Sequence, residues 1–233
     1  MIDIALFVVL ALCVLAGYYR GTIYASISIG VTILSFLIAL LFVPLLSGAV
    51  RSSEDIYGSL VYYFEGYEYV SETSVELIHE PAVAITDEQL DVILYNADMP
   101  IPMGKSVEKN IKNQVYADQG IITLGDYFNQ TIVDVVLNIL SLLVLFVCIR
   151  TILGFVLRMI DHGMKGFPSF NRFDAPFSCG IGFLHGILLL YVVFLLAPVA
   201  FTVVPALEEY LNESFFGGFF YRVNPLLYLI PTT

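Results

Sequence analysis

Three polar residues within one apolar stretch, Asp134, Asn138 and Arg150, are the strongest candidates for chemistry in this sequence. An ionisable side chain in such a stretch is costly and normally faces water or the interior of a helix bundle. Asp134 is therefore a candidate proton or cation site, unless it lies near the end of its helix and forms only local hydrogen bonds. Arg150 is expected to extend toward an interface or to pair with Asp161. A helix rises about 1.5 Å per residue, so about 24 Å separates Asp134 from Arg150 and the two cannot pair within it.

Small residues recur at four-residue spacing in two other apolar stretches. One stretch contains Ser178, Gly182 and Gly186, and another contains Ser26 and Gly30. Residues at this spacing share one helix face and let a second backbone approach closely, which matters in a bilayer because hydrophobic attraction between helices is weak there. Packing within the chain is the favoured interpretation, and homodimerisation and a ligand passage are the alternatives.

The sequence lacks the residue patterns of a catalytic, metal or nucleic-acid site. Ser178 has no glycine-containing nucleophile motif before it, and no acid is placed to orient His185. The three histidines and three cysteines show no ligand spacing. We find neither a glycine-rich phosphate loop nor a basic nucleic-acid patch. The sequence therefore predicts a protein that is not an enzyme, holds no cofactor or metal and binds no nucleic acid.

The composition indicates a membrane protein. Hydrophobic residues make up 58% of the 233 residues and charged residues 13%, whereas soluble domains have about 45–50% and about 25%. An apolar run of about 18 residues is long enough to span a bilayer as a helix. The predicted fold is an all-α membrane protein with four transmembrane helices, at about 2–19, 22–46, 130–157 and 180–204.

A long acidic insertion, 51–129, separates the second and third predicted helices. Between residues 51 and 130, 14 Asp and Glu oppose 4 Lys and Arg, which accounts for most of the net charge of −11. Thr86 and Gln89 form the pattern of a capping box and predict a short amphipathic helix. Ser106 is a candidate cap for a second one. We therefore expect the insertion to be folded and partly helical.

Basic residues in short loops predict the orientation of the helices. Arg20 lies in the first predicted turn, 18–21, and three more basic residues lie in the loop 158–179, whereas Arg51 is close to a helix end on the other side. Both short loops are therefore expected inside the cell, and the insertion and both termini outside. The interrupted apolar stretch 215–230 is expected at the interface. The predicted segments are 1–50, 51–129, 130–204 with its basic cytoplasmic loop, and an extracytoplasmic tail at 205–233.

Short motifs in this sequence resemble those of the colicin V production protein (CvpA) family of bacterial inner-membrane proteins. Asp3 leads directly into the first apolar run, which ends in Gly17, Arg20 and Gly21, like the Gly-x-x-Arg-Gly of that family. A second group of motif residues leads into the last apolar run: Asn171 and Arg172 come before it, and Ser178, Gly182 and Gly186 follow at four-residue spacing, with His185 just before the last glycine. The segment 173–177 and the acidic insertion are both longer than is usual in the family.

The resemblance implies an integral protein of the bacterial cytoplasmic membrane that assists the production or export of a peptide toxin and helps to maintain the cell envelope. It transfers no catalytic residue. The expected partners are the lipid bilayer, a membrane or secretion-machinery protein, a cationic peptide attracted to the insertion, and a second copy of the chain. The alternative function is a small oligomeric transporter or channel that uses Asp134, Asn138 and Arg150.

Overall fold

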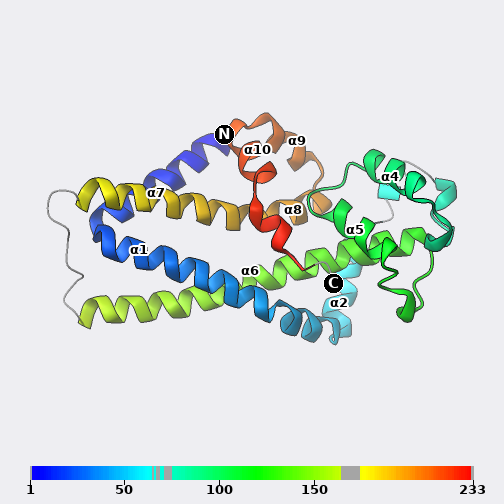
Figure 1. Cartoon of the computed structure of the whole chain (residues 1–233), viewed down its shortest axis with the longest axis horizontal. Helices are drawn as coiled ribbons and strands as arrows, with labels where there is room; N and C mark the ends of the chain where they lie inside the picture. The colour runs from blue at the N-terminus through cyan, green and yellow to red at the C-terminus, as the bar shows by residue number, and fades with distance from the viewer. Residues whose placement is uncertain (1, 65, 67–68, 71–74, 164–173, 232–233) are drawn as a thin grey trace. The chain divides into compact units, whose positions relative to one another are not determined.

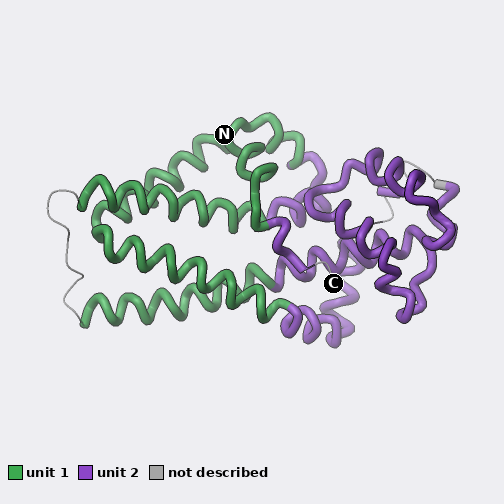
Figure 2. Tube along the Cα trace, viewed as in Figure 1, with its two compact units in different colours: residues 1–43, 142–195, 208–226 green, residues 44–141, 196–207, 227–233 purple. Residues whose placement is uncertain are grey.

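The computed structural model describes residues 2–64, 66, 69–70, 75–163 and 174–231. Within these residues the regular elements are helices, apart from one isolated β-bridge between Pro81 and Thr123. The chain forms two compact units, each built from segments that are distant in the sequence (Figure 2). Unit 1 comprises 1–43, 142–195 and 208–226, and unit 2 comprises 44–141, 196–207 and 227–233.

The longest helix, α1 (Ile2–Arg51), bends sharply at Gly21 (Figure 1). Gly21 has φ 79° and ψ 165°, a conformation that is open to glycine and unfavourable for other residues. Asp174 holds the bend, because its carboxylate accepts the backbone N–H of Thr22 at 3.1 Å and its backbone oxygen accepts the Thr22 hydroxyl at 3.0 Å. The bend divides α1 into two arms, 2–20 and 22–51, at the turn expected from the sequence.

The second arm of α1 is longer than predicted, since it passes through Pro44 and ends at Arg51 instead of near residue 46. A proline removes one helical hydrogen bond and usually bends or ends a helix. The turns after Pro44 are held by contacts within unit 2, where Ser47 is buried and Arg51 forms an ion pair with Asp134. These contacts involve residues far away in the sequence, so the local pattern could not predict the extension.

The third predicted helix is also longer, because α6 spans Leu124–Gly163 instead of 130–157. Thr123 caps its first turn: its hydroxyl accepts the backbone N–H of Asp126 at 3.2 Å and donates to the Asp126 carboxylate at 2.6 Å. The first turns of α6 therefore extend into the region that the sequence suggested was insertion.

The last predicted helix starts earlier and is interrupted. α7 (Asp174–Val193) is followed by a 3-10 turn, η5 (Phe194–Leu196), and by α8 (Ala197–Val203). An acid and a proline favour the first turn of a helix, and Asp174 and Pro176 lie in that turn. The interruption falls just before Pro198, which lies in the first turn of α8.

Short helices fill the segment between α1 and α6. They are α2 (Glu54–Tyr63), η1 (Val75–Leu77), η2 (Ala82–Ala84), α4 (Asp87–Asn96), α5 (Met103–Lys112) and η3 (Ala117–Gln119). The capping box of α4 is formed, with Thr86 and Gln89 in reciprocal hydrogen bonds. The prediction for Ser106 is wrong, because α5 starts at Met103 and Ser106 is buried inside it, where its hydroxyl donates to the backbone oxygen of Pro102.

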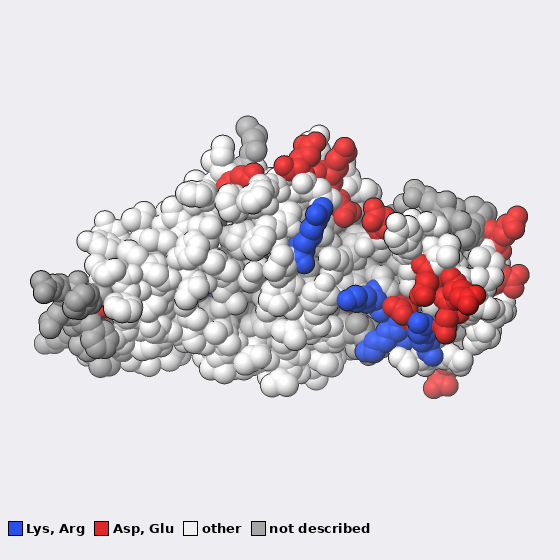
Figure 3. Space-filling model, turned by 45° about the horizontal axis from the view of Figure 1, so that its top comes forward, with Lys and Arg blue, Asp and Glu red and all other residues white. Residues whose placement is uncertain are grey.

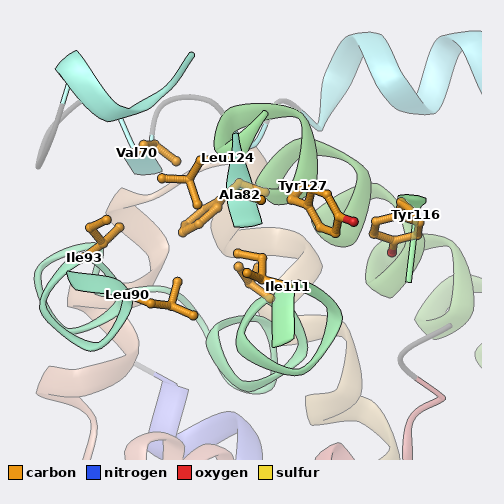
Figure 4. Close-up of a cluster of buried hydrophobic side chains, with 10 residues drawn as sticks. Val70, Ala82, Leu90, Ile93, Ile111, Tyr116, Leu124 and Tyr127 are labelled. Atoms are coloured by element: carbon orange, nitrogen blue, oxygen red, sulfur yellow. The ribbon is translucent and has the colours of Figure 1, made fainter. Parts of the chain in front are cut away.

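The insertion has a hydrophobic core of its own within unit 2. Side chains from α4, α5 and the start of α6 point toward one another there (Figure 4). The first turns of α6 contribute Leu124, Tyr127 and Phe128, each at most 3% exposed. Burying side chains of this size stabilises a fold by about 1.5–3 kcal/mol each, so the insertion is a packed structure and not a loop. The buried members of the core are Val70, Ala82, Leu90, Ile93, Val107, Ile111, Tyr116, Leu124, Tyr127 and Phe128.

The C-terminal segment forms short helices, α9 (Ala206–Glu213), α10 (Phe215–Arg222) and η6 (Pro225–Leu229). In unit 1, Asp3 of α1 binds the start of α10, where its carboxylate accepts the Ser214 hydroxyl at 2.7 Å and the Phe216 N–H at 2.9 Å. The apolar stretch that begins at residue 215 is thus divided into pieces too short to span a bilayer.

Three segments in the described part of the chain are long and apolar enough to cross a membrane: α1, α6 and Asp174–Val203. Large apolar side chains are exposed on all three, among them Phe7, Leu41, Ile152 and Leu184. On the face drawn in Figure 3, charged side chains gather over the short helices and leave a broad uncharged area. Exposed apolar surface of this extent is expected of a protein that contacts lipid.

Candidate functional site

The carboxylate of Asp134 is at the centre of a buried polar network in unit 2. The side chain is 2% exposed, and Oδ1 lies 3.1 Å from the guanidinium of Arg51. Oδ1 also accepts a hydrogen bond from Gln130 at 3.1 Å, and Oδ2 accepts one from the Tyr116 hydroxyl at 2.9 Å. Both carboxylate oxygens are therefore engaged, and the charge is balanced by an arginine from the end of α1.

The network continues through side chains that are buried or half-buried. Asn110 of α5 donates to the Tyr116 hydroxyl at 3.0 Å and to the Thr131 hydroxyl at 3.1 Å. Gln130 donates to the Tyr57 hydroxyl at 2.7 Å. Burial, assisted by the charge of Asp134, raises the pKa of Tyr116 well above its usual range, so its hydroxyl remains a donor at physiological pH.

Asn138 lies one helical turn beyond Asp134 and is 1% exposed. Its amide donates to the backbone oxygen of Pro231 at 2.9 Å, so it joins α6 to the C-terminal segment of unit 2. Asp134 and Asn138 are thus both buried on α6, and both have partners within unit 2. The geometry resembles a structural clamp more closely than an open ion site.

Arg150 lies in unit 1 and bonds to hydroxyls of α1. Its Nε donates to Thr32 at 3.0 Å and one of its terminal nitrogens, Nη2, donates to Ser28 at 3.1 Å. The Thr32 hydroxyl also lies 3.0 Å from Nε2 of His185 and donates to the backbone oxygen of Ser28. The hydroxyl has a single proton, so with that bond formed Nε2 of His185 acts as the donor to Thr32. Of the two expectations for Arg150, pairing with Asp161 is not found among the described residues, since the partners of Arg150 are these hydroxyls of α1.

A cavity of about 420 Å³ lies beside Arg150 in unit 1. Three arginines line it, Arg20, Arg150 and Arg158, and no carboxylate is among the described residues at its wall. Arg20 lies over the ring of the buried Tyr24, with 5.0 Å between the guanidinium carbon and the ring centre, and donates to the Tyr24 hydroxyl at 3.4 Å. The remaining lining residues are Thr151, Gly154 and Phe155.

The small residues of α7 face the first arm of α1. A Cβ added at Gly182 would lie 2.6 Å from the backbone oxygen of Cys13, and one added at Gly17 would meet the backbone oxygen of Ser178. A Cβ at Gly186 would lie 3.0 Å from Leu10. This face of α7 is therefore occupied by the chain's own helix, as the favoured interpretation of the spacing expected.

Ser26 and Gly30, on the second arm of α1, have a different environment. Both are exposed, and a Cβ at Gly30 would meet no atom within 4 Å. The Ser26 hydroxyl donates to the backbone oxygen of Thr22 in its own helix. No close packing therefore involves these two positions within the described residues.

The described motif residues make structural contacts or lie near the polar side chains of unit 1. Asp3 binds α10, Gly21 forms the bend of α1, and Arg20 and His185 lie near Arg150. Asn171 and Arg172 lie outside the described residues. A site residue that the sequence reasoning missed is Arg51, whose partner is about 80 residues away, and others are Ser28, Thr32, Tyr116 and Asn110. For Ser28 and Thr32, the local signal in the sequence is that small hydroxyl side chains occur on an otherwise apolar helix.

The fold and the two polar centres define a class: an α-helical protein with three segments able to cross a membrane, one of which carries a buried aspartate and a half-buried arginine. Comparison with known proteins finds no matching family model, no similar curated protein and no similar solved structure. The resemblance to the CvpA family therefore stays a prediction that rests on its motif residues.

Proposed function

We propose that this chain is a four-span protein of the bacterial cytoplasmic membrane, with the acidic insertion and both termini outside the cell. The bend at Gly21 supports the fourth span, because it makes two apolar arms out of α1. The 18-residue length needed for a span fits within each arm. The clustering of Arg20 and Arg158 at one cavity supports a common cytoplasmic location for the two short loops.

The function that the geometry supports best is that of an accessory scaffold, which assists peptide toxin production or export and envelope maintenance. One observation carries this proposal: Asp134, the candidate for membrane chemistry, has both carboxylate oxygens bound by fixed partners. A buried charge with such partners positions helices and does not exchange ions readily. A scaffold would use the rigid helices to present the folded insertion to a membrane or secretion-machinery protein, either alone or as a homodimer.

The acidic insertion is the proposed contact surface for a cationic peptide. Its excess of Asp and Glu produces a field that attracts basic partners and speeds their encounter. Exposed charges are screened beyond about 8 Å at physiological ionic strength. Peptide binding to the insertion should therefore weaken as salt is added, and binding that is independent of salt would argue against this surface.

Secreted toxin titre from cells lacking this chain tests the proposed function. We expect a lowered titre that wild type restores. Gly182→Leu should fail to restore it, because the larger side chain would meet the backbone of Cys13, whereas the matched variant Gly180→Leu should succeed, because a Cβ at Gly180 meets no atom within 4 Å. An unchanged titre in cells lacking the chain would refute the toxin role.

The alternative proposal, a small oligomeric transporter or channel, requires Arg51 to leave Asp134 during each cycle. Reconstituted protein should then show ion or proton flux that Asp134→Asn abolishes. Absence of flux in wild type, together with wild-type behaviour of Asp134→Asn in cells, would exclude this alternative.

A further inference from the structure

The arginine-lined cavity of unit 1 has no role in the scaffold function, and its chemistry points to a ligand. We propose that it binds the phosphate group of an anionic phospholipid headgroup through Arg20, Arg150 and Arg158. The proposal depends on these residues and on the membrane location of the chain, and it is independent of any role in toxin export.

The wall of the cavity is positively charged and therefore attracts anions. Three guanidinium groups line it, and each is a planar donor suited to phosphate oxygens. Asp174 forms its hydrogen bond with Thr22, two residues from Arg20, and it is not one of the described residues that line the cavity. The three like charges at this wall repel one another, and a bound anion would relieve that repulsion.

Arg150 is held in position before any ligand arrives. Ser28 and Thr32 accept hydrogen bonds from Nη2 and Nε, which fixes the plane of the guanidinium. The third nitrogen, Nη1, forms no hydrogen bond with the described residues and lies against Gly154, 2.7 Å from where a Cβ would be. The glycine thus makes room for Nη1 at the cavity, and a preorganised donor of this kind binds without first losing side-chain freedom.

Arg20 is held in a similar way, because the Tyr24 ring and hydroxyl both contact it. Arg158 is exposed and lies two helical turns from Arg150 on α6, so it can close over a ligand from the outside. The cavity volume of about 420 Å³ is within the range of pockets that bind small molecules.

The surroundings of the cavity favour a lipid over a small soluble anion. Phe155, which lines the cavity, is 64% exposed. Ile152, Val156 and Met159 of the same helix are also exposed apolar residues, so acyl chains could lie along α6 while the headgroup occupies the cavity. Basic pockets between transmembrane helices on the cytoplasmic side commonly bind anionic headgroups. Free phosphate offers the same oxygens without the chains.

The test uses the full chain in nanodiscs of phosphatidylcholine that contain a minor fraction of phosphatidylglycerol, with native mass spectrometry of retained lipid. We expect wild type to retain phosphatidylglycerol preferentially. Arg20→Gln and Arg158→Gln should each weaken that retention about tenfold, the loss expected for one charge-assisted hydrogen bond. Arg222→Gln, which removes the same charge from α10, is the matched control and should behave as wild type.

A second variant separates geometry from charge. Gly154→Ala keeps every arginine and favours the helix, but its methyl group would displace Nη1 of Arg150. We expect it to weaken phosphatidylglycerol retention, and retention equal to wild type would remove Arg150 from the site.

Inorganic phosphate, added to the detergent-solubilised protein, distinguishes the two sources of the ligand. Thermal stabilisation by phosphate in wild type but not in Arg158→Gln, without lipid selectivity in nanodiscs, would keep the site and assign it to a soluble phosphate. If neither phosphatidylglycerol nor phosphate distinguished wild type from the arginine variants, the proposal would be overturned.

Discussion

The charge of Asp134 is balanced inside unit 2 by Arg51, and the two groups differ in their access to water. The aspartate side chain is 2% exposed and the arginine side chain 37% exposed. Replacing a whole buried pair with neutral groups is often nearly neutral, whereas removing one partner leaves a buried charge without compensation. The main effect of the ion pair is therefore to determine which helix turns meet, and its net contribution to the free energy of unfolding is small.

This asymmetry makes a prediction for Arg51→Gln. We expect the free energy of unfolding in detergent, measured by titration with sodium dodecyl sulfate, to fall by about 3 kcal/mol, because the Asp134 carboxylate stays buried and unpaired. Adding Asp134→Asn to this variant should restore most of the loss. A double variant no more stable than Arg51→Gln would show that the ion pair is not the source of the effect.

Tyr116 makes a second prediction, which concerns alkaline pH. Its pKa is raised in the folded protein, so above pH 10 the unfolded state releases the tyrosine proton first and stability falls as pH rises. Tyr116→Phe removes this proton. We expect wild type to lose stability above pH 10 more steeply than Tyr116→Phe, by up to about 1.4 kcal/mol per pH unit, as followed by thermal unfolding. Equal slopes would show that Tyr116 ionises freely in the folded chain.

At the scale of elements, the contact between α1 and α7 is a contact between backbones. Gly17 and Gly182 let the two helices approach closely, and no side chain separates them at this point. Close approach of this kind replaces the hydrophobic attraction that helices lack in lipid. The strength of this contact depends on how closely the two surfaces fit, so the addition of a single methyl group should change the free energy of unfolding.

Gly182→Ala and Gly180→Ala test this contact as a matched pair on one helix. The first adds a methyl group 2.6 Å from the Cys13 backbone oxygen, and the second adds one where no atom lies within 4 Å. We expect Gly182→Ala to lower the free energy of unfolding by about 1–3 kcal/mol. Gly180→Ala should leave it unchanged or raise it by up to about 1 kcal/mol. Equal effects would mean that helix propensity alone decides both.

Local sequence rules could predict the features for which nearby residues give the main signal. The capping box at Thr86 depends on residues three positions apart, and the bend at Gly21 falls at a glycine, which tolerates its backbone conformation, although distant Asp174 also holds it; both are found where the sequence suggested. The continuation of α1 through Pro44 depends on contacts far along the chain, and so does the pairing of Arg51. The arginine cavity could not be predicted either, because it joins residues of α1 and α6 that no spacing rule relates.

For the whole molecule, the chain combines exposed apolar helices with a packed insertion that carries most of its negative charge. The proposed orientation places the insertion outside the cell and the loop after α6 inside. The three native cysteines are free, so they can be replaced by serine before new labelling sites are introduced.

Two labelling sites test the proposed orientation in cells. Tyr95→Cys lies on α4 of the insertion, where the tyrosine is 87% exposed, and His162→Cys lies at the exposed end of α6. We expect a maleimide that cannot cross membranes to label Tyr95→Cys in intact cells and His162→Cys only after permeabilisation. The opposite pattern would invert the orientation, and labelling of both sites in intact cells would place them on one side.

The pairing of Arg51 with Asp134 also has a consequence for the order of biosynthesis. A ribosome adds about 5–20 residues per second, so roughly 4–16 s pass between the synthesis of these two residues. During that interval the end of α1 has emerged without its counter-ion. The partial exposure of Arg51 is compatible with this delay, because a guanidinium that reaches water can stay hydrated until Asp134 has been synthesised. The formation of α6 would then fix the position of the end of α1.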